Sequence, residues 1–255
     1  MDLLFNQGIT HIYKSNSQKI RVMTEDWVLQ NIFCPNCGQP VNEYKNNKPV
    51  ADFYCKKCIE DFELKSKNGN FSKKISAGAY SKMIERINSF EKPNFFFMGY
   101  RINTLSVKDF FVVPKHFFIS EIIEKRKPLS ETARRAGWVG ANILFSKIPK
   151  AGRIFYIENG IEINKKLILE KWQKTLFLKQ IKRTEEKGWI LDIMNCIDAL
   201  GKKEFSLEEL YVFESDLQAM HPKNKHIKDK IRQQLQFLRD KDYIDFLGQG
   251  RYKLK

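Results

Sequence analysis

Two carboxylates and a lysine form the group in this sequence that is best suited to chemistry. Ten residues separate Asp52 from Glu63, and Lys65 lies two positions beyond Glu63. Side chains alternate between the faces of a strand, so Glu63 and Lys65 are expected on one face. Paired carboxylates suit Mg²⁺, and a neighbouring lysine can orient or help deprotonate an attacking water. The pattern predicts metal-assisted attack of water on a phosphate, although a solvated strand edge explains the letters ELK equally well by themselves.

Four cysteines are spaced as in a zinc site. Cys34 and Cys37 form one CxxC pair, Cys55 and Cys58 form another, and 17 residues lie between the pairs. Two intervening residues let one tight turn present both sulfurs to a tetrahedral ion. Gly38 suits the positive φ that such a turn needs. We expect a structural Zn²⁺ site, with two disulfides or a coincidence as the alternatives.

The cysteines also bear on how the carboxylates are positioned. The extended runs PVADFY and DFELK flank the second CxxC pair, with Asp52 in the first run and Glu63 in the second. A zinc knuckle between them would fold the chain back and place Asp52 beside Glu63 and Lys65. The zinc is therefore expected to be structural, but to hold the chemical site together.

The rest of the first 183 residues predicts a mixed α/β domain. Hydrophobic periodicity indicates helices at 12–31 and 76–90, and apolar runs indicate buried strands at 94–100, 109–114 and 153–160. Between them, residues 121–152 are basic and interrupted by Gly and Pro.

Residues 184–255 predict a winged helix. Apolar residues recur at helical spacing over 186–200 and 225–240. Ser206 can cap a helix over 207–217, with Glu209 completing a capping box. The segment YIDFLGQGRYKLK indicates a terminal hairpin. We place the domain boundary near residue 183.

The distribution of charge favours a polyanionic partner. The net charge is +15, and residues 1–183 carry all of it, because 184–255 hold 13 basic and 13 acidic residues. Within the second domain, 184–220 are acidic and 221–255 are basic. A basic surface that only aids solubility is the alternative. No apolar run is long enough to span a membrane, and the first residues do not read as a secretory signal, so we expect a cytoplasmic protein with reduced cysteines.

The spacing Asp-x₁₀-Glu-x-Lys resembles the signature of the PD-(D/E)xK nuclease superfamily, with Ala51 in place of the proline. Longer motifs carry a closer resemblance. KSNSQK, TEDW, CPNCG, NNKPVADFYCKKC, FELKSKNGNFS, RKPLSETARRAGWVG and HIKDKIRQQLQFLRDKD are similar to the DpnI family of methyl-directed restriction endonucleases. The similarity runs from about residue 12 to the C-terminus.

The resemblance implies an α/β nuclease core of the PD-(D/E)xK type with an inserted zinc knuckle, followed by a winged helix. It further implies a monomer that cuts double-stranded DNA at GATC only when the adenine is N6-methylated. It implies Mg²⁺-dependent cleavage between A and T that leaves blunt ends. By the same resemblance, Asp52, Glu63 and Lys65 are the expected catalytic residues, and Asp52 and Glu63 are the expected Mg²⁺ ligands. The four cysteines, Cys34, Cys37, Cys55 and Cys58, are the expected zinc ligands.

Two segments are candidates for DNA contact. In the first domain, Arg134 and Arg135 can hold phosphates, and Gly137 and Gly140 would leave Trp138 free to reach a methyl group. Trp138 as a core residue is the alternative. In the second domain, one face of the helix 225–240 can hold phosphates and read bases, unless it is an ordinary solvated face. That face carries Lys225, Lys228, Lys230, Arg232, Gln233, Gln236 and Arg239.

Two other functions compete with methyl-directed restriction. A non-catalytic DNA-binding regulator would use the zinc knuckle and the winged helix for docking alone, and would be expected to lack one of Asp52, Glu63 and Lys65; none is missing. A nuclease for branched or damaged DNA could share the same core. Digestion of methylated and unmethylated plasmid separates these possibilities.

Overall fold

The computed structural model of the 255-residue chain describes residues 1–44, 51–89 and 91–255. They form two compact units, one of Met1–Phe145 with Ala151–Gln173 and one of Ser146–Lys150 with Lys174–Lys255. The domain boundary near residue 183 stays a prediction. Pro49 and Val50 of the predicted strand, and Phe90 of the predicted helix, lie outside the described residues.

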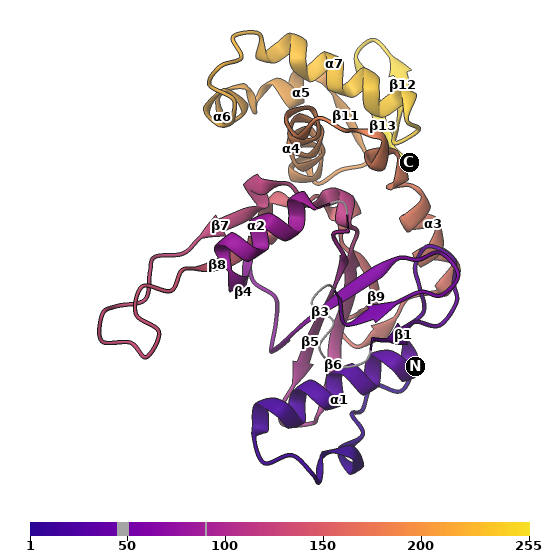
Figure 1. The fold of residues 1–255 in the computed structure, drawn as a ribbon. Helices are drawn as coiled ribbons and strands as arrows, with labels where there is room; N and C mark the ends of the chain where they lie inside the picture. The colour runs from indigo at the N-terminus through magenta and orange to yellow at the C-terminus, as the bar shows by residue number, and fades with distance from the viewer. Residues whose placement is uncertain (45–50, 90) are drawn as a thin grey trace. The chain divides into compact units, whose positions relative to one another are not determined.

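A seven-stranded mixed sheet forms the centre of the first unit (Figure 1). Its order is β1-β2-β3-β5-β6-β9-β10, with β3 and β5 parallel and the other neighbours antiparallel. The strands are β1 Asn42–Glu43, β2 Phe53–Tyr54, β3 Asp61–Asn68, β5 Asn94–Arg101, β6 Ser106–Val113, β9 Ile154–Glu158 and β10 Ile161–Glu162.

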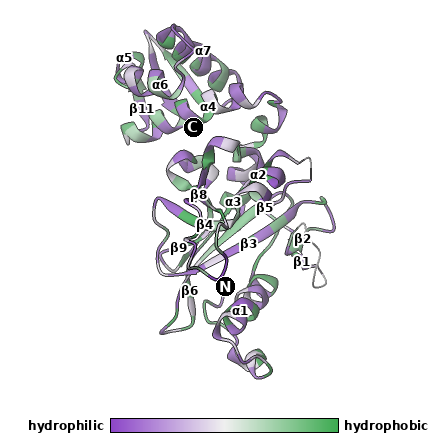
Figure 2. Cartoon of the chain, turned by 60° about the vertical axis from the view of Figure 1, so that its left-hand side comes forward, coloured by the Kyte–Doolittle hydropathy of each residue, from purple (hydrophilic) through white to green (hydrophobic). Residues whose placement is uncertain are grey.

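The core of this unit surrounds β5, whose apolar run predicted a buried strand. Residues 94–100 are all buried, and Figure 2 colours most of β5 as hydrophobic. Helix α1 (Asn16–Asn31) covers the sheet, with the Trp27 ring 5.5 Å from the Phe110 ring. Helix α3 (Lys165–Gln173) packs against β9. Burial on both sides fixes the sheet that carries the candidate site.

A second sheet, of order β4-β8-β7, carries helix α2 and a long loop. Its strands are β4 Lys74–Ala79, β8 Gly140–Leu144 and β7 Ile123–Lys125, and α2 is Tyr80–Asn88. The helix predicted from residue 76 was wrong for its first four residues, because these small residues pair with β8. Figure 1 shows the loop between β7 and β8 as an arm that projects from this sheet.

The second unit is a winged helix. Its helices are α4 Thr184–Leu200, α5 Leu207–Tyr211, α6 Glu214–Met220 and α7 Ile227–Asp240, and its sheet has the order β11 (Glu204–Ser206), β13 (Arg251–Leu254), β12 (Ile244–Gly248). The capping box at Ser206 and Glu209 is confirmed. The single helix predicted over 207–217 was wrong: a break at Val212–Phe213 separates α5 from α6. Strand β11 was not predicted.

Short 3₁₀ helices connect many of these elements. They are Gln7–Thr10, Lys115–Phe117, Ser120–Ile122, Phe145–Lys147, Lys150–Gly152 and Leu176–Gln180.

Among the described residues, no helix has the length and apolar character that crossing a membrane requires.

Candidate active site and zinc centre

The four cysteines of the two CxxC pairs converge in the first unit. Cys34 Sγ lies 3.4 Å from Cys58 Sγ, Cys37 Sγ lies 3.4 Å from Cys55 Sγ, and all four sulfurs lie within 4.8 Å of one another. All four are free cysteines, so this structure contains no disulfide bond between them. Sulfurs about 2.3 Å from a tetrahedral Zn²⁺ would be spaced in this way. The cluster therefore fits a zinc ion.

Both cysteine turns present backbone N–H groups to sulfur. Burial raises the pKa of the Cys34 thiol. Burial acts in the same direction on Cys55, but the backbone N–H groups of Cys58 and Lys57 outweigh it and lower the pKa of that thiol. The closeness of the four sulfurs favours a bound cation, since a metal ion stabilises the thiolate form of its cysteine ligands.

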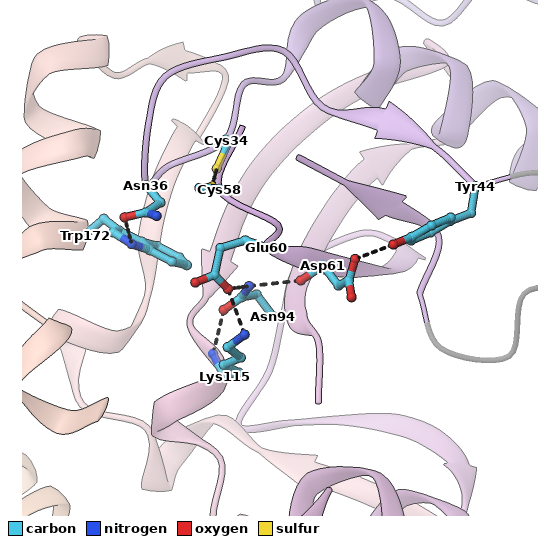
Figure 3. A network of polar contacts seen from close by, with 9 residues as sticks. All are labelled: Cys34, Asn36, Tyr44, Cys58, Glu60, Asp61, Asn94, Lys115 and Trp172. Atoms are coloured by element: carbon cyan, nitrogen blue, oxygen red, sulfur yellow. Dashed lines mark hydrogen bonds and ion pairs between the residues drawn. The ribbon is translucent and has the colours of Figure 1, made fainter. Parts of the chain in front are cut away.

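Hydrogen bonds attach the first cysteine turn to α3 (Figure 3). Trp172 Nε1 donates to Asn36 Oδ1 at 3.2 Å, as Figure 3 shows. Lys165 Nζ also donates to Gly38 O at 2.8 Å. Trp172 is fully buried. The first turn is therefore fixed to a helix that itself packs on the central sheet.

A buried polar network attaches the second turn to the sheet (Figure 3). Glu60 is only 5% exposed and accepts from Asn94 Nδ2 at 3.0 Å and from Lys115 Nζ at 2.9 Å. Asn94 Nδ2 also donates to Asp61 O at 2.9 Å. A buried carboxylate needs such partners, so the network fixes where β3 leaves the cysteine turn.

Asp52 lies in a bend before β2, so its predicted place within a strand was wrong. Two hydrogen bonds nevertheless hold it against β3. Its N–H donates to Phe62 O at 3.0 Å, and its Oδ2 accepts from the Leu64 N–H at 2.7 Å. The second cysteine turn thus folds the chain back and brings Asp52 beside the strand that carries Glu63.

Glu63 and Lys65 share one face of β3, as the alternation predicts. Lys65 Nζ donates to Glu63 Oε1, and the Glu63 side chain is buried. Parallel pairing with β5 sets Glu63 opposite Phe95 and Lys65 opposite Phe97. The rigid central strand therefore fixes the backbone of both residues.

The electrostatics of this group favour a bound cation. Burial raises the pKa of the Asp52 carboxyl, the Leu64 N–H lowers it, and the charge of Glu63 raises it further. The buried Glu63 carboxylate and the half-buried Asp52 carboxylate repel each other, so a divalent ion that both bind would stabilise them. The donor set of Asp52 and Glu63 oxygens fits Mg²⁺, and the catalytic roles stay predictions.

Sequence reasoning missed three charged neighbours of this group. From α2, Arg86 Nη1 bonds Glu63 Oε2. From α1, Arg21 Nε donates to Glu25 Oε1 at 2.7 Å. Burial raises the pKa of the Glu25 carboxyl, and the negative charge of Asp52 raises it further. Glu25 therefore interacts electrostatically with the candidate site. Glu25 belongs to the motif TEDW, whereas no sequence pattern linked Arg86 to Glu63.

Trp138 lies at the base of the projecting loop between β7 and β8. Its side chain is half-buried, and the Arg135 guanidinium lies 4.7 Å from its ring centre. A Cβ atom on Gly140 would meet the ring at 2.7 Å, so the ring rests directly on this glycine. The expected freedom of Trp138 is therefore reduced on that side. Arg134 and Arg135 are exposed, and contact of all three residues with DNA stays a prediction.

The basic face predicted on the helix 225–240 is largely exposed and lies on α7, which begins only at Ile227, so Lys225 precedes the helix. Ile231, Leu235 and Leu238 are buried on its opposite face. Three surface ion pairs engage its cations: Lys228 with Glu214 at 3.5 Å, Arg232 with Asp229 at 2.9 Å and Arg239 with Asp240 at 2.8 Å. Such exposed pairs contribute little stability and can be exchanged for phosphates. The exposed candidates are Lys225, Lys228, Arg232, Gln233, Gln236 and Arg239, while Lys230 is half-buried.

Two family models match the chain, one over its first part and one over its last part. Residues 1–181 match the model of DpnI, described as the Dam-replacing family, and residues 185–254 match the model of the Dam-replacing HTH domain. Together the two matches span nearly the whole chain. Membership supports a methyl-directed restriction endonuclease with a winged-helix DNA-binding domain. The chain belongs to the DpnI (Dam-replacing) family.

Proposed function

We propose that this protein cuts double-stranded DNA at GATC sites that contain N6-methyladenine, by Mg²⁺-dependent hydrolysis between A and T. The observation that carries the proposal is the position of Asp52 beside Glu63 and Lys65 across a zinc-binding turn. This arrangement joins a metal-binding carboxylate pair to a lysine, in a chain of the DpnI family. Double-stranded DNA is the proposed partner of a monomeric enzyme.

In the proposed reaction, Asp52 and Glu63 hold the metal, and the Leu64 N–H keeps Asp52 oriented. Bound Mg²⁺ would stabilise the negative charge that develops on the phosphate. Lys65 Nζ would orient the attacking water and, in its neutral form, take the proton that this water loses. The water oxygen bonds to phosphorus while the bond between phosphorus and O3′ breaks, and the departing O3′ atom takes a proton from a second water molecule.

The discrimination of methylated DNA requires more than one contact. Burial of one methyl group contributes about 0.8 kcal/mol, a preference of roughly fourfold. A palindromic site carries two methyl groups, and Trp138 of the first unit and α7 of the second could each read them. Several small preferences then multiply. The half-buried indole of Trp138 offers the apolar surface that a methyl group needs.

The decisive experiment uses short duplexes with one GATC site that is methylated on both strands, one strand or neither. We expect blunt products from the fully methylated duplex in Mg²⁺, and none without Mg²⁺ or from the unmethylated duplex. Equal cutting of all three duplexes, or of branched DNA in preference, would indicate a different nuclease. Binding without any cutting would indicate a regulator.

A further inference from the structure

Arg86 is the second cation that contacts the buried Glu63 carboxylate. Lys65 bonds one carboxylate oxygen, Oε1, and Arg86 bonds the other, Oε2. The Glu63 side chain is 12% exposed and that of Arg86 is 29% exposed. Both oxygens of a proposed metal ligand are therefore engaged by cations.

Arg86 also borders an open hollow of about 520 Å³ beside the candidate site. Glu63 and Lys65 line it from β3, and Lys82, Glu85 and Arg86 line it from α2, with Glu91 beyond the helix; Lys82 is paired with Glu85. A DNA phosphate in this hollow would lie beside Lys65. Arg86 thus contacts Glu63 and also lines the space that the substrate would take.

A divalent ion and Arg86 compete for the same carboxylate. An ion that binds Glu63 needs at least one of its oxygens, and it repels both neighbouring cations. Lys65 is fixed by its strand only two positions away, whereas Arg86 reaches Glu63 with a long side chain from another element. Arg86 is therefore the cation that can leave Glu63 without any displacement of β3.

We propose that Arg86 neutralises Glu63 in the metal-free enzyme and, when a divalent ion binds, transfers to a DNA phosphate in the hollow. The inference rests on the proposed function. A guanidinium suits both places, because its planar fork bonds carboxylates and phosphates alike. Arg86 is on this account a positioning residue in the free enzyme and a substrate-binding residue during cleavage.

The first test measures metal affinity without DNA, by titrating the zinc-loaded full chain with Mn²⁺ and detecting free Mn²⁺ by electron paramagnetic resonance. Arg86→Ala should bind Mn²⁺ roughly three- to tenfold more tightly than the wild type, because the competing cation is gone. Lys171→Ala, which removes one exposed charge from α3, should change nothing. Unchanged or weaker Mn²⁺ binding by Arg86→Ala would overturn the proposal.

The second test measures single-turnover cleavage of methylated duplex at saturating Mg²⁺. Arg86→Ala should cut about 10- to 100-fold more slowly than the wild type. The same substitution would thus raise the affinity for Mn²⁺ and lower the cleavage rate. A misfolded variant would lose both, and in that case Arg86→Gln, which keeps most of the side chain, replaces it. A wild-type rate for Arg86→Ala would contradict the proposal. If the wild-type chain cuts nothing, the proposed function fails, and the Mn²⁺ titration still decides whether Arg86 competes for Glu63.

Discussion

Ile59 occupies the position in the second cysteine turn that Gly38 occupies in the first. The Gly38 N–H donates to Cys34 O at 2.8 Å, and the Ile59 N–H donates to Cys55 O at 2.9 Å. Both have positive φ, +75° for Gly38 and +55° for Ile59. Glycine adopts this conformation freely, whereas a β-branched residue is strained in it. The Ile59 side chain is also 84% exposed and gains little from packing.

Ile59→Gly should therefore stabilise the zinc-loaded protein. Relief of strain of about 1 kcal/mol corresponds to a rise in Tm of roughly 2–4 °C. The reciprocal change, Gly38→Ala, should lower the Tm, since its Cβ would meet Lys165 Cε at 3.2 Å. Calorimetry of both variants checks this, and a lower Tm for Ile59→Gly would show that the turn is not strained.

One zinc per chain should co-purify with the protein, and its loss should disable cleavage. The zinc turn joins the segment that bears Asp52 to the strand that bears Glu63, so the two carboxylates separate without it. Cys58→Ser should lose zinc and activity together, whereas Cys196→Ala, at a buried cysteine outside the cluster, should keep both. Elemental analysis paired with digestion of methylated plasmid measures the two properties. If Cys58→Ser cleaved DNA without bound zinc, zinc would not be required to position Asp52 and Glu63.

Asp52→Asn should stabilise the protein in the absence of Mg²⁺ while abolishing cleavage. Burial raises the folded-state pKa of Asp52, so ionisation opposes folding at pH values above the unfolded pKa of about 3.9. Asparagine carries no charge and keeps an oxygen for the Leu64 N–H. We expect a Tm gain of about 2–4 °C at pH 7 that disappears as the pH falls below about 4. A gain that persists at pH 3, or a loss at pH 7, would mean that charge is not the cause.

Gly140→Ala should impair methyl recognition by displacing Trp138. The new Cβ would lie 2.7 Å from the indole ring, so the ring must move. We expect the affinity for methylated duplex, measured in Ca²⁺, to fall by at least about fourfold relative to the affinity for unmethylated duplex, the value of one methyl contact. In a Trp138→Phe background the smaller ring leaves room, so Gly140→Ala should weaken binding little further. Equal weakening of binding to both duplexes would make Trp138 a scaffold residue.

The sequence predicted the elements whose determinants are local. The apolar run of β5, the helical periodicity of α4 and α7 and the capping box at Ser206 all depend on neighbouring residues. The spacing of the cysteines likewise predicted the cluster, because each pair is formed by one turn. The segment that became β4 was misread because its small residues have no strong preference, and pairing with β8 decides their structure.

The surroundings of the site could not be predicted because they depend on tertiary contacts. Arg86 reaches Glu63 from α2, and Glu60 meets Asn94 only because β3 and β5 pair in parallel. Asp52 lies outside a strand yet is held by the backbone of the next one. Spacing in the sequence thus indicated Asp52, Glu63 and Lys65 as a candidate site, while the charged residues around them could be identified only from the fold.

The central claim is that Asp52, Glu63 and Lys65 form the cutting site, and Lys65 tests it most directly. Lys67 lies two residues further along β3, carries the same charge and does not line the hollow beside Glu63. The measurement is the single-turnover cleavage rate of methylated GATC duplex in Mg²⁺, with duplex affinity measured in Ca²⁺. Lys65→Ala should cut at least about 100-fold more slowly with nearly unchanged affinity, and Lys67→Ala should cut at close to the wild-type rate. Cleavage by Lys65→Ala at a rate close to that of Lys67→Ala would contradict the assigned site.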